Sequence, residues 1–308
     1  MTRISTTFKM RLPATSANLG SGFDAAAIAL SFGLQIEAQA AEEFSIEASG
    51  LDRDQCSRLE NNLILEIYKR ILELNSKAAT PILIRMHNEI PLGMGCGSSA
   101  AGRLAAIALA VHFGELDWCP EQILEEACAL EGHPDNAAAC WLGGFVAAAS
   151  EGRTVHVARV VPPADWRAIV VLPRDSLATS KARAVLPASY ASADVVTNIQ
   201  AVSMLGLAFA QQRGDLLRVA MQDRIHQPYR AEMCPMLPRL LPLAGKTGIL
   251  GVGLSGAGPS VLVVVESDAK LPAASESITH ALEGFPEPRL LACSFDASGA
   301  SHSLDLWS

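Results

Sequence analysis

The sequence lacks the surplus of basic residues that nucleic-acid-binding proteins usually carry. Its 308 residues include 24 lysines and arginines against 32 aspartates and glutamates, so the formal net charge is −8. This balance argues against nucleic acid as a partner. Any anionic nucleotide must therefore be held by local backbone donors and a metal ion, since the overall charge of the protein is also negative.

The sequence also lacks a hydrophobic run long enough to cross a membrane. Its most apolar stretch, Ala100 to Phe113, is too short and contains Arg103 and His112. The segment from Met1 to Pro13 has no continuous apolar core of the kind found in secretory signals. We therefore expect no membrane association and a cytoplasmic location.

Cysteines are few and show no pairing pattern. There are seven, an odd number, and no two are spaced as C-x-x-C. A disulfide framework or a zinc site is therefore not expected, and buried reduced thiols are the simpler interpretation. By contrast, half of the residues are hydrophobic and only 18% are charged, which predicts a globular protein with a sizeable core.

Hydrophobic periodicity predicts strands and helices in both halves of the chain. In the first half we expect strands over residues 8–12, 30–40, 44–48, 81–86 and 145–149, with helices over 62–74, 120–130 and 136–141 and an alanine-rich helix ending near 113. In the second half we expect strands over 169–172, 248–254 and 261–265, and helices over 180–185, 195–212 and 216–221. A break near 160–168, marked by Pro162 and Pro163, divides the chain into residues 1–165 and 166–308.

A glycine-rich loop precedes the alanine-rich helix. Gly93, Gly95 and Gly97 alternate along it, and Ser98 and Ser99 follow at once. Free N–H groups at the start of a helix bind anions, and serine hydroxyls can donate to phosphate or ligate Mg²⁺. The loop is not a Walker A motif, because no Lys-Ser or Lys-Thr pair follows the glycines.

A dinucleotide site is an alternative for this loop, because Gly95-x-Gly97-x-x-Ala100 also fits that fingerprint. An ordinary glycine-rich turn is a second alternative. Another nominal match, Gly251-x-Gly253-x-x-Gly256, precedes an expected strand instead of a helix and is rejected as a dinucleotide loop.

Four blocks of small and polar residues follow one another along the chain. They are Pro13 to Asp24, Pro91 to Ala101, Glu131 to Asn136 with Gly143-Gly144, and Gly253 to Ser260. In this order they resemble the GHMP kinase family, and the first and third resemble the branch of it that phosphorylates homoserine. Met94, Cys96 and Ser21 depart from the usual residues of these motifs but suit the same backbone.

The resemblance implies an α+β fold with two lobes. The N-terminal lobe is expected to resemble domain 2 of ribosomal protein S5, and the C-terminal lobe is expected to be ferredoxin-like. It implies an ATP-dependent phosphotransferase that converts the side-chain hydroxyl of L-homoserine to O-phospho-L-homoserine in threonine biosynthesis. A homodimer is common among such kinases.

The resemblance also assigns residues to the nucleotide and its metal ion. ATP is expected across Pro91, Leu92, Gly93, Met94, Gly95, Cys96, Gly97, Ser98, Ser99, Ala100 and Ala101. Ser99 and Glu125 are the expected Mg²⁺ ligands. Glu131 is a competing carboxylate for this role, and Glu125 could instead simply lie on a solvated helix face. Asn62 is either an adenine contact or the N-cap of its helix.

The amino-acid substrate needs partners for its carboxylate, ammonium and hydroxyl groups. A carboxylate prefers arginine, and Arg183, close to Thr179, and Arg230 match the family positions for this role. The ammonium and hydroxyl groups prefer Asp or Asn oxygens. The resemblance assigns this role to Asn18, Asp24 and Asn136.

Position 136 bears on the mechanism. Other branches of the family have an aspartate base there, whereas Asn136 cannot accept a proton at neutral pH. The resemblance therefore implies catalysis by positioning and charge neutralisation without a dedicated base. Asp24 is the fallback base, and His133 is expected to be structural rather than a base.

Three alternatives stay open at this stage. The first is a GHMP kinase for a different alcohol, although a neutral sugar would not need Arg183 and Arg230. The second is a nicotinamide oxidoreductase, which would need an acidic residue after a strand about 20 residues beyond the loop. Glu115 and Asp117 stand near that distance, but no strand precedes them. The third is a non-catalytic sensor.

Overall fold

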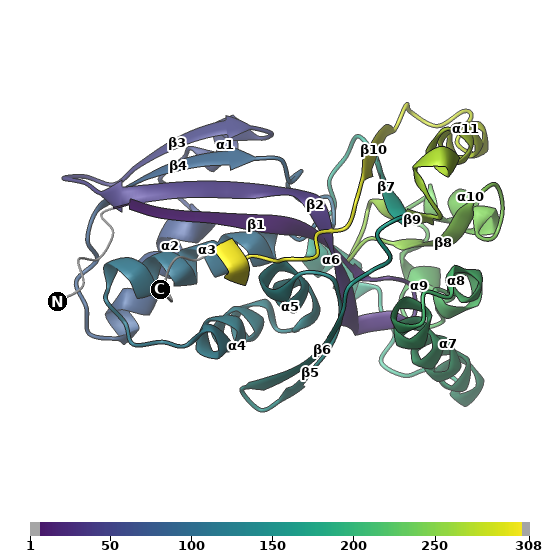
Figure 1. Ribbon diagram of the computed structural model, residues 1–308, viewed down its shortest axis with the longest axis horizontal. Coiled ribbons are helices and arrows are strands. Elements are labelled where there is room, and N and C mark those ends of the chain that lie inside the picture. The colour runs from purple at the N-terminus through teal and green to yellow at the C-terminus, as the bar shows by residue number, and fades with distance from the viewer. Residues whose placement is uncertain (1–6, 304–308) are drawn as a thin grey trace.

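The computed structural model describes residues 7–303 and has two lobes, each built on its own β-sheet (Figure 1). The outermost residues of the two expected domains, 1–6 and 304–308, lie outside this range. Residues 1–6 belong to the segment from Met1 to Pro13, in which no secretory signal is expected, so that part of the prediction lies outside the described residues.

The N-terminal lobe holds a six-stranded mixed sheet. Its order is β3–β4–β2–β5–β6, and β1 pairs with β2. Only the β3–β4 pair is parallel. The strands are β1 (Thr7–Asn18), β2 (Gly22–Ala40), β3 (Ser45–Gly50), β4 (Ile82–Asn88), β5 (Phe145–Glu151) and β6 (Thr154–Val160).

Helices pack against this sheet and form the lobe's core. They are α1 (Arg53–Cys56), α2 (Leu63–Leu74), α3 (Ser98–Phe113), α4 (Pro120–Glu131) and α5 (Asp135–Leu142). Helix α3 is buried almost all round, from Ala100 to Val111. This explains why alanine and other apolar residues predominate in it, since a helix enclosed on almost every side needs little polar surface.

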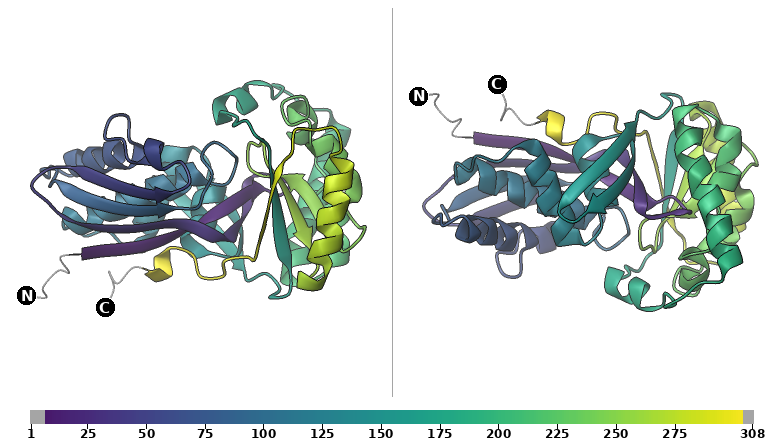
Figure 2. Two further views of the ribbon diagram at one scale, coloured as in Figure 1. Left: turned by 90° about the horizontal axis from the view of Figure 1, so that it is seen from above. Right: turned by 90° about the horizontal axis from the view of Figure 1, so that it is seen from below.

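The first motif block, Pro13 to Asp24, forms the end of a long β-hairpin, so its first strand extends well beyond the strand expected over residues 8–12. Strand β1 continues to Asn18 and β2 begins at Gly22, with register shifts at Pro13/Ala14 and Ala17/Asn18. Residues 13–20 are all buried, so their small side chains fit a close approach to neighbouring elements. Tertiary packing outweighs their weak strand propensity. The hairpin extends from the N-terminal lobe into the other lobe (Figure 2).

The C-terminal lobe holds a four-stranded antiparallel sheet in the order β10–β7–β9–β8. Its strands are β7 (Arg167–Leu172), β8 (Ile249–Leu254), β9 (Val261–Val265) and β10 (Arg289–Cys293). Helices join β7 to β8 and β9 to β10, so the connectivity is the split βαβ arrangement of ferredoxin-like folds. This α+β fold with two sheets confirms the expected fold class.

The helices of this lobe are α6 (Thr179–Ala184), α7 (Ser192–Ala210), α8 (Gly214–Ala220), α9 (Gln227–Arg230), α10 (Leu237–Leu240) and α11 (Leu271–Ala281). By length and composition alone, α7 could cross a membrane. Its mean hydropathy is 1.3, and 28% of that stretch is buried. Core helices of soluble proteins can have the same length and composition. The most apolar stretch expected from the sequence, Ala100 to Phe113, lies instead in the shorter helix α3.

The end of the described chain returns to the N-terminal lobe. After β10, Phe295 bridges to Leu30, and Asp296 accepts a hydrogen bond of 2.6 Å from Arg11. A 3-10 turn over Ser301–Ser303 then lies against α5 and β1. The proposed division at 165/166 falls between β6 and β7 and stays a prediction, because the last residues pack on the first lobe.

Candidate active site

Three of the four motif blocks meet where the hairpin tip enters the C-terminal lobe. The N–H of Thr15 donates to the carbonyl of Cys96 (3.1 Å), and the N–H of Gly256 donates to the carbonyl of Ala17 (3.0 Å). The hydroxyl of Ser255 donates to the carbonyl of Gly95 (2.8 Å). Segments far apart in sequence, by 160 residues for Ser255 and Gly95 and by more for Gly256 and Ala17, are thus joined by direct hydrogen bonds.

The glycine loop needs its glycines for both conformation and space. Gly93, Gly95 and Gly97 all have positive φ. A Cβ on Gly95 would lie 2.2 Å from the carbonyl oxygen of Ser255, and one on Gly97 would lie 1.9 Å from Oγ1 of Thr15. Only glycine combines this backbone with such close neighbours.

The loop ends at the start of α3, whose first N–H groups lack partners within the helix. The first intrahelical bond runs from the N–H of Ala101 to the carbonyl of Gly97. The preceding N–H groups, those of Ser98, Ser99 and Ala100, are free to face an anion, and the first turn holds no acidic side chain. The expected anion site therefore has the required geometry.

Two other loop residues lie behind this surface. Cys96 is 1% exposed, and its burial raises the pKa of its thiol to about 12, so it stays an unreactive neutral group. Ala101 is fully buried in the core.

A cavity of about 320 Å³ lies in front of the helix start and collects most of the predicted substrate residues. The members of the predicted set that line it are Asn18, Asp24, Gly93, Gly95, Gly97, Ser98, Ser99, Ala100, Asn136, Thr179, Arg183 and Arg230. The predicted residues that do not line it are Asn62, Pro91, Leu92, Met94, Cys96, Ala101 and Glu125.

Arg183 and Asp24 form a bidentate ion pair at the cavity wall. The two guanidinium nitrogens of Arg183 donate to the two carboxylate oxygens of Asp24 at 2.9 and 2.7 Å. These hydrogen bonds, together with the charge of Asp24, raise the pKa of Arg183 against the opposing effect of burial. Asp24 is therefore engaged as an acceptor, which argues against its role as a free base.

Arg230 is buried in the same cavity but has no acidic partner. It is 1% exposed, and it forms no ion pair with a carboxylate within residues 7–303. Its Nε donates to the carbonyl of Ala182 (3.0 Å), and one terminal nitrogen contacts Nδ1 of His226 (3.1 Å). Burial, and secondarily the charge of Arg183, lowers the pKa of this guanidinium. A buried cation without a counter-ion favours an anionic ligand.

His226 supports Arg230 as a neutral ring. Its Nε2 lies 2.8 Å from the carbonyl oxygen of Gly20 and must donate there, which leaves Nδ1 to accept from Arg230. Burial lowers the pKa of His226 and keeps the ring neutral. The ring of Phe23 stacks on His226 and lies under both guanidinium groups, at 5.3 Å from Arg230 and 5.7 Å from Arg183.

Asn136 is the second residue of α5 and is held by neighbours on two sides. Its Oδ1 accepts from the hydroxyl of Thr15 at 2.6 Å, and its N–H donates to Oδ1 of Asp135 at 2.7 Å. The same Asp135 oxygen lies 2.6 Å from Nδ1 of His133. Burial disfavours the charged ring, but the hydrogen bond and charge of Asp135, with Glu131, outweigh it and raise the pKa of His133. This pairing supports the structural role expected of His133.

Ser99 is linked to an acidic residue through a cation. Arg103, one turn further along α3, donates to the hydroxyl of Ser99 and to the carboxylate of Glu131. Glu131 lines the cavity, whereas Glu125 is half-buried on α4 and outside it. The structure thus brings the competing carboxylate, Glu131, close to Ser99, and the assignment of Glu125 stays a prediction.

A second cavity of about 300 Å³ adjoins the first and shares Ser98 and Ser99 with it. Asn62 and Leu92 line this cavity. The side chain of Asn62 caps α2, because Oδ1 accepts from the N–H groups of Ile64 and Leu65 at 3.1 and 3.2 Å. Its Nδ2 donates to two loop carbonyls, so no side-chain donor is left for adenine. The N-cap role is present, and the adenine contact stays a prediction.

Sequence reasoning missed several side chains that shape the cavity. Thr15 and Phe23 lie inside the first motif block, but nothing in the sequence indicated their partners. Arg103 stands one helical turn after Ser99, which is the only signal that could have placed it. Asp135 belongs to the third block and could have been expected as an oxygen donor beside Asn136.

Comparisons with known proteins agree with this geometry. The family model described as GHMP kinases N terminal domain matches residues 62–144, and the one described as GHMP kinases C terminal matches residues 207–284. With these matches and the relatives below, the chain belongs to the GHMP kinase family. This confirms the resemblance seen in the sequence.

Several proteins similar in sequence are named homoserine kinase. One from Solibacter usitatus is 42% identical over 84% of this chain and 85% of its own length. Another from Persephonella marina is 34% identical over 91% of both chains. The crystal structure of homoserine kinase from Cytophaga hutchinsonii has a TM-score of 0.82 at 24% identity and covers 97% of this chain and 98% of its own. At that identity it shows the shared fold.

Proposed function

We propose that the protein is a homoserine kinase, which transfers the γ-phosphoryl group of ATP to the side-chain hydroxyl of L-homoserine. The observation that carries the proposal is the buried guanidinium of Arg230, which forms no ion pair within the described residues and lies in one cavity with the free N–H groups at the start of α3. An amino-acid carboxylate supplies the missing charge. The relatives named homoserine kinase support the same substrate, and the product, O-phospho-L-homoserine, belongs to threonine biosynthesis.

The rest of the cavity matches the remaining groups of the substrate. Asp24 and Asp135 bring carboxylate oxygens to the same cavity as the side-chain oxygens of Asn18 and Asn136, which suits an ammonium group. Arg183, fixed by Asp24, is the second cation near the carboxylate, and Thr179 lines the same wall. Asn18 fixes the wall, since its Nδ2 donates to the carbonyl of Gly256 at 2.7 Å.

Phosphoryl transfer then depends on positioning and on neutralisation of charge. The N–H groups at the start of α3 receive the phosphates of ATP, and Asn136 orients the substrate hydroxyl. The hydroxyl oxygen attacks the γ-phosphorus, its proton passes to the phosphoryl group, and ADP leaves. Asn136 cannot take that proton, and Asp24 is occupied by Arg183, so no residue acts as a dedicated base.

We further propose that Mg²⁺ accompanies ATP. The donor set fits a cation, because the guanidinium of Arg103 already bonds to both the hydroxyl of Ser99 and the carboxylate of Glu131. Ser99 with Glu125 or Glu131 would hold the ion. When bound, Mg²⁺ neutralises charge on the phosphates.

We also propose that the protein forms a homodimer and is located in the cytoplasm. Helix α7 exposes Val196, Ile199 and Leu207 to solvent at 53%, 56% and 51%, and this apolar face supports a contact between two copies. Light scattering of the purified protein tests the dimer.

A substrate panel tests the main proposal. ADP release is measured with homoserine, threonine, mevalonate and galactose as acceptors, each against a water background. Turnover is expected with homoserine far above the other three. Absence of turnover with homoserine above the water background would refute the proposal, and a preference for another alcohol would favour a different GHMP kinase.

A further inference from the structure

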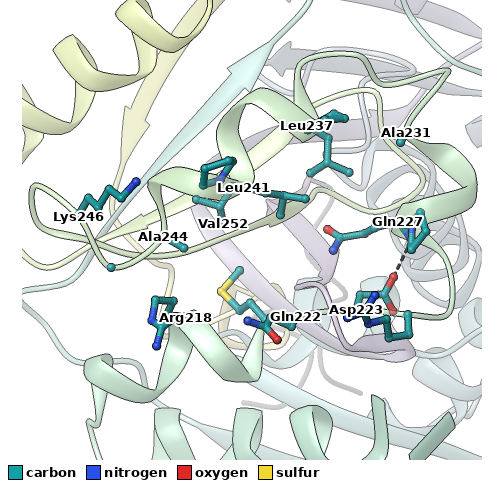
Figure 3. A pocket seen from close by; sticks show the side chains of 16 residues that line it. Arg218, Gln222, Asp223, Gln227, Ala231, Leu237, Leu241, Ala244, Lys246 and Val252 are labelled. Carbon is teal, nitrogen blue, oxygen red and sulfur yellow. Dashed lines mark hydrogen bonds between the residues drawn. The ribbon is translucent and has the colours of Figure 1, made fainter. Parts of the chain in front are cut away.

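A larger cavity lies in the C-terminal lobe, separate from the candidate active site (Figure 3). It encloses about 690 Å³ between α8, α10 and β8, an edge strand of the sheet. It shares no lining residue with the cavity in front of α3. Its volume is in the range of small-molecule sites.

One wall of this cavity is apolar. Met221, Leu237 and Val252 are buried there, at 1–2% exposure, with Leu241 beside them. Figure 3 shows Leu237, Leu241 and Val252 gathered on one side of the cavity. Such a wall favours the hydrocarbon part of a ligand, since its burial removes apolar surface from water.

The opposite end of the cavity is positively charged. Two exposed side chains, Arg218 and Lys246, line it, and neither forms an ion pair or a side-chain hydrogen bond within residues 7–303. A third cation, Arg224, lines the cavity beside Asp223. Arg218 lies across Gly245, where a Cβ would come within 2.7 Å of its Cδ. Figure 3 shows both cations at the end near Ala244. Two cations without acidic partners favour an anionic group.

The only acidic side chain in the lining, Asp223, does not cancel this charge. Its carboxylate accepts from the N–H groups of Ile225, His226 and Gln227 at 3.0, 2.9 and 2.6 Å, and its side chain is fully buried. It lies at the far end of the cavity from Lys246 (Figure 3). Its acceptor capacity serves the backbone and is not free for a ligand cation.

A buried amide adds a specific polar contact. Gln227 is 3% exposed, and its Oε1 accepts from the N–H of Leu254 at 2.7 Å. Its Nε2 donates to no group in the described chain, and the amide points into the cavity (Figure 3). An amide donor that faces the cavity and has no protein acceptor is available to a ligand oxygen.

The same segment reaches the candidate active site from its other side. His226 and Arg230 follow Asp223 within one short stretch, and both contact the substrate cavity or its supports. A ligand bound to Gln227 would therefore restrict the segment that carries Arg230.

We propose that this cavity binds a small amphipathic anion, with its charge at Arg218 and Lys246 and its apolar body against Leu237, Leu241 and Val252. Occupancy tightens the segment 223–230 and changes the affinity for the acceptor substrate. The second effect rests on the proposed kinase function, whereas the binding itself does not.

The test uses 1-anilinonaphthalene-8-sulfonate, an amphipathic anion whose fluorescence rises in apolar sites. Its neutral analogue without the sulfonate, N-phenyl-1-naphthylamine, is the matched ligand. The full-length protein is titrated with each as wild type and as the double variant Arg218→Gln/Lys246→Gln. The control is the double variant Arg239→Gln/Lys270→Gln, which changes two exposed cations of the same lobe outside the cavity.

We expect the cavity variant to bind the sulfonate about tenfold more weakly, because two charge contacts are lost. It should bind the neutral analogue unchanged, and the control variant should match the wild type. Ala244→Phe, which fills the cavity from a half-buried position, should weaken both ligands. Circular dichroism confirms that each variant is folded.

Three results would overturn the proposal: no saturable binding of the sulfonate, equal affinity in all variants, or displacement of the probe by ATP, which would place it at the other site. The kinase assay is a separate readout. A change in the homoserine KM at saturating sulfonate, absent in the cavity variant, supports the coupling, and an unchanged KM refutes it. Because fluorescence does not depend on turnover, an inactive protein that binds the probe would refute only the kinase proposal.

Discussion

Replacement of Arg230 by methionine should separate substrate binding from stability. The side chain is buried without a counter-ion, so its charge is a cost to the free protein and a benefit only when an anion binds. Removal of a buried partner of a charged ligand typically costs about 2–4 kcal/mol of binding. This corresponds to a fall of about 30- to 700-fold in kcat/KM for homoserine.

The effect on folding should be smaller because two contributions oppose each other. Methionine leaves the carbonyl of Ala182 and Nδ1 of His226 without a donor, at about 1–3 kcal/mol each. It also removes a desolvated guanidinium that lacks an ion pair, which returns several kcal/mol at most. We expect the free energy of unfolding to change by less than about 2 kcal/mol.

The assay is ADP release at varied homoserine and saturating ATP, with unfolding in urea as the companion measurement. The KM for ATP should stay close to that of the wild type. Arg239→Met is the matched control, since Arg239 is exposed on α10 and outside the candidate site. If kcat/KM for homoserine in the Arg230 variant stays within threefold of the wild type, the assignment of the carboxylate site is wrong.

Three further predictions follow from the same geometry. Asn136→Ala should lose most activity and Asn136→Asp should be no faster than the wild type; a faster Asp variant would show that a base is used. Glu125→Gln and Glu131→Gln should differ in the Mg²⁺ concentration needed for half-maximal activity, and loss of the true ligand should raise it about 10- to 100-fold; a value equal to that of the wild type in both variants would exclude a metal role for either. Burial lowers the pKa of His226, so the unfolded chain takes up a proton below about pH 6.5 while the folded chain does not, and stability should fall as pH falls from that point. His226→Gln, which keeps one donor and one acceptor, should flatten the dependence measured by urea unfolding at pH 7.5, 6.5 and 5.5; an unchanged slope would contradict this.

Local sequence patterns predicted much of the fold correctly. The apolar stripe from Leu63 to Leu74 became α2 with Asn62 as its N-cap, and the glycine loop opened into α3 at Ser98. These features depend on neighbouring residues alone. The extension of β1 to Asn18 was missed, because the small residues of that block are held in a strand by distant elements.

The candidate site divides in the same way. The order of the glycine and polar blocks was enough to identify the kinase family and to select most of the residues around the cavity in front of α3. The sequence alone could not show that Thr15 donates to Asn136 across 121 positions, or that Arg103 joins Ser99 to Glu131. Nor could it show that Asp24 is paired with Arg183 while Arg230 has no counter-ion. Backbone conformation and free helix N–H groups are local properties that the order of residues specifies. Burial, charge pairing and the cavity in the C-terminal lobe depend on which distant segments the fold brings together.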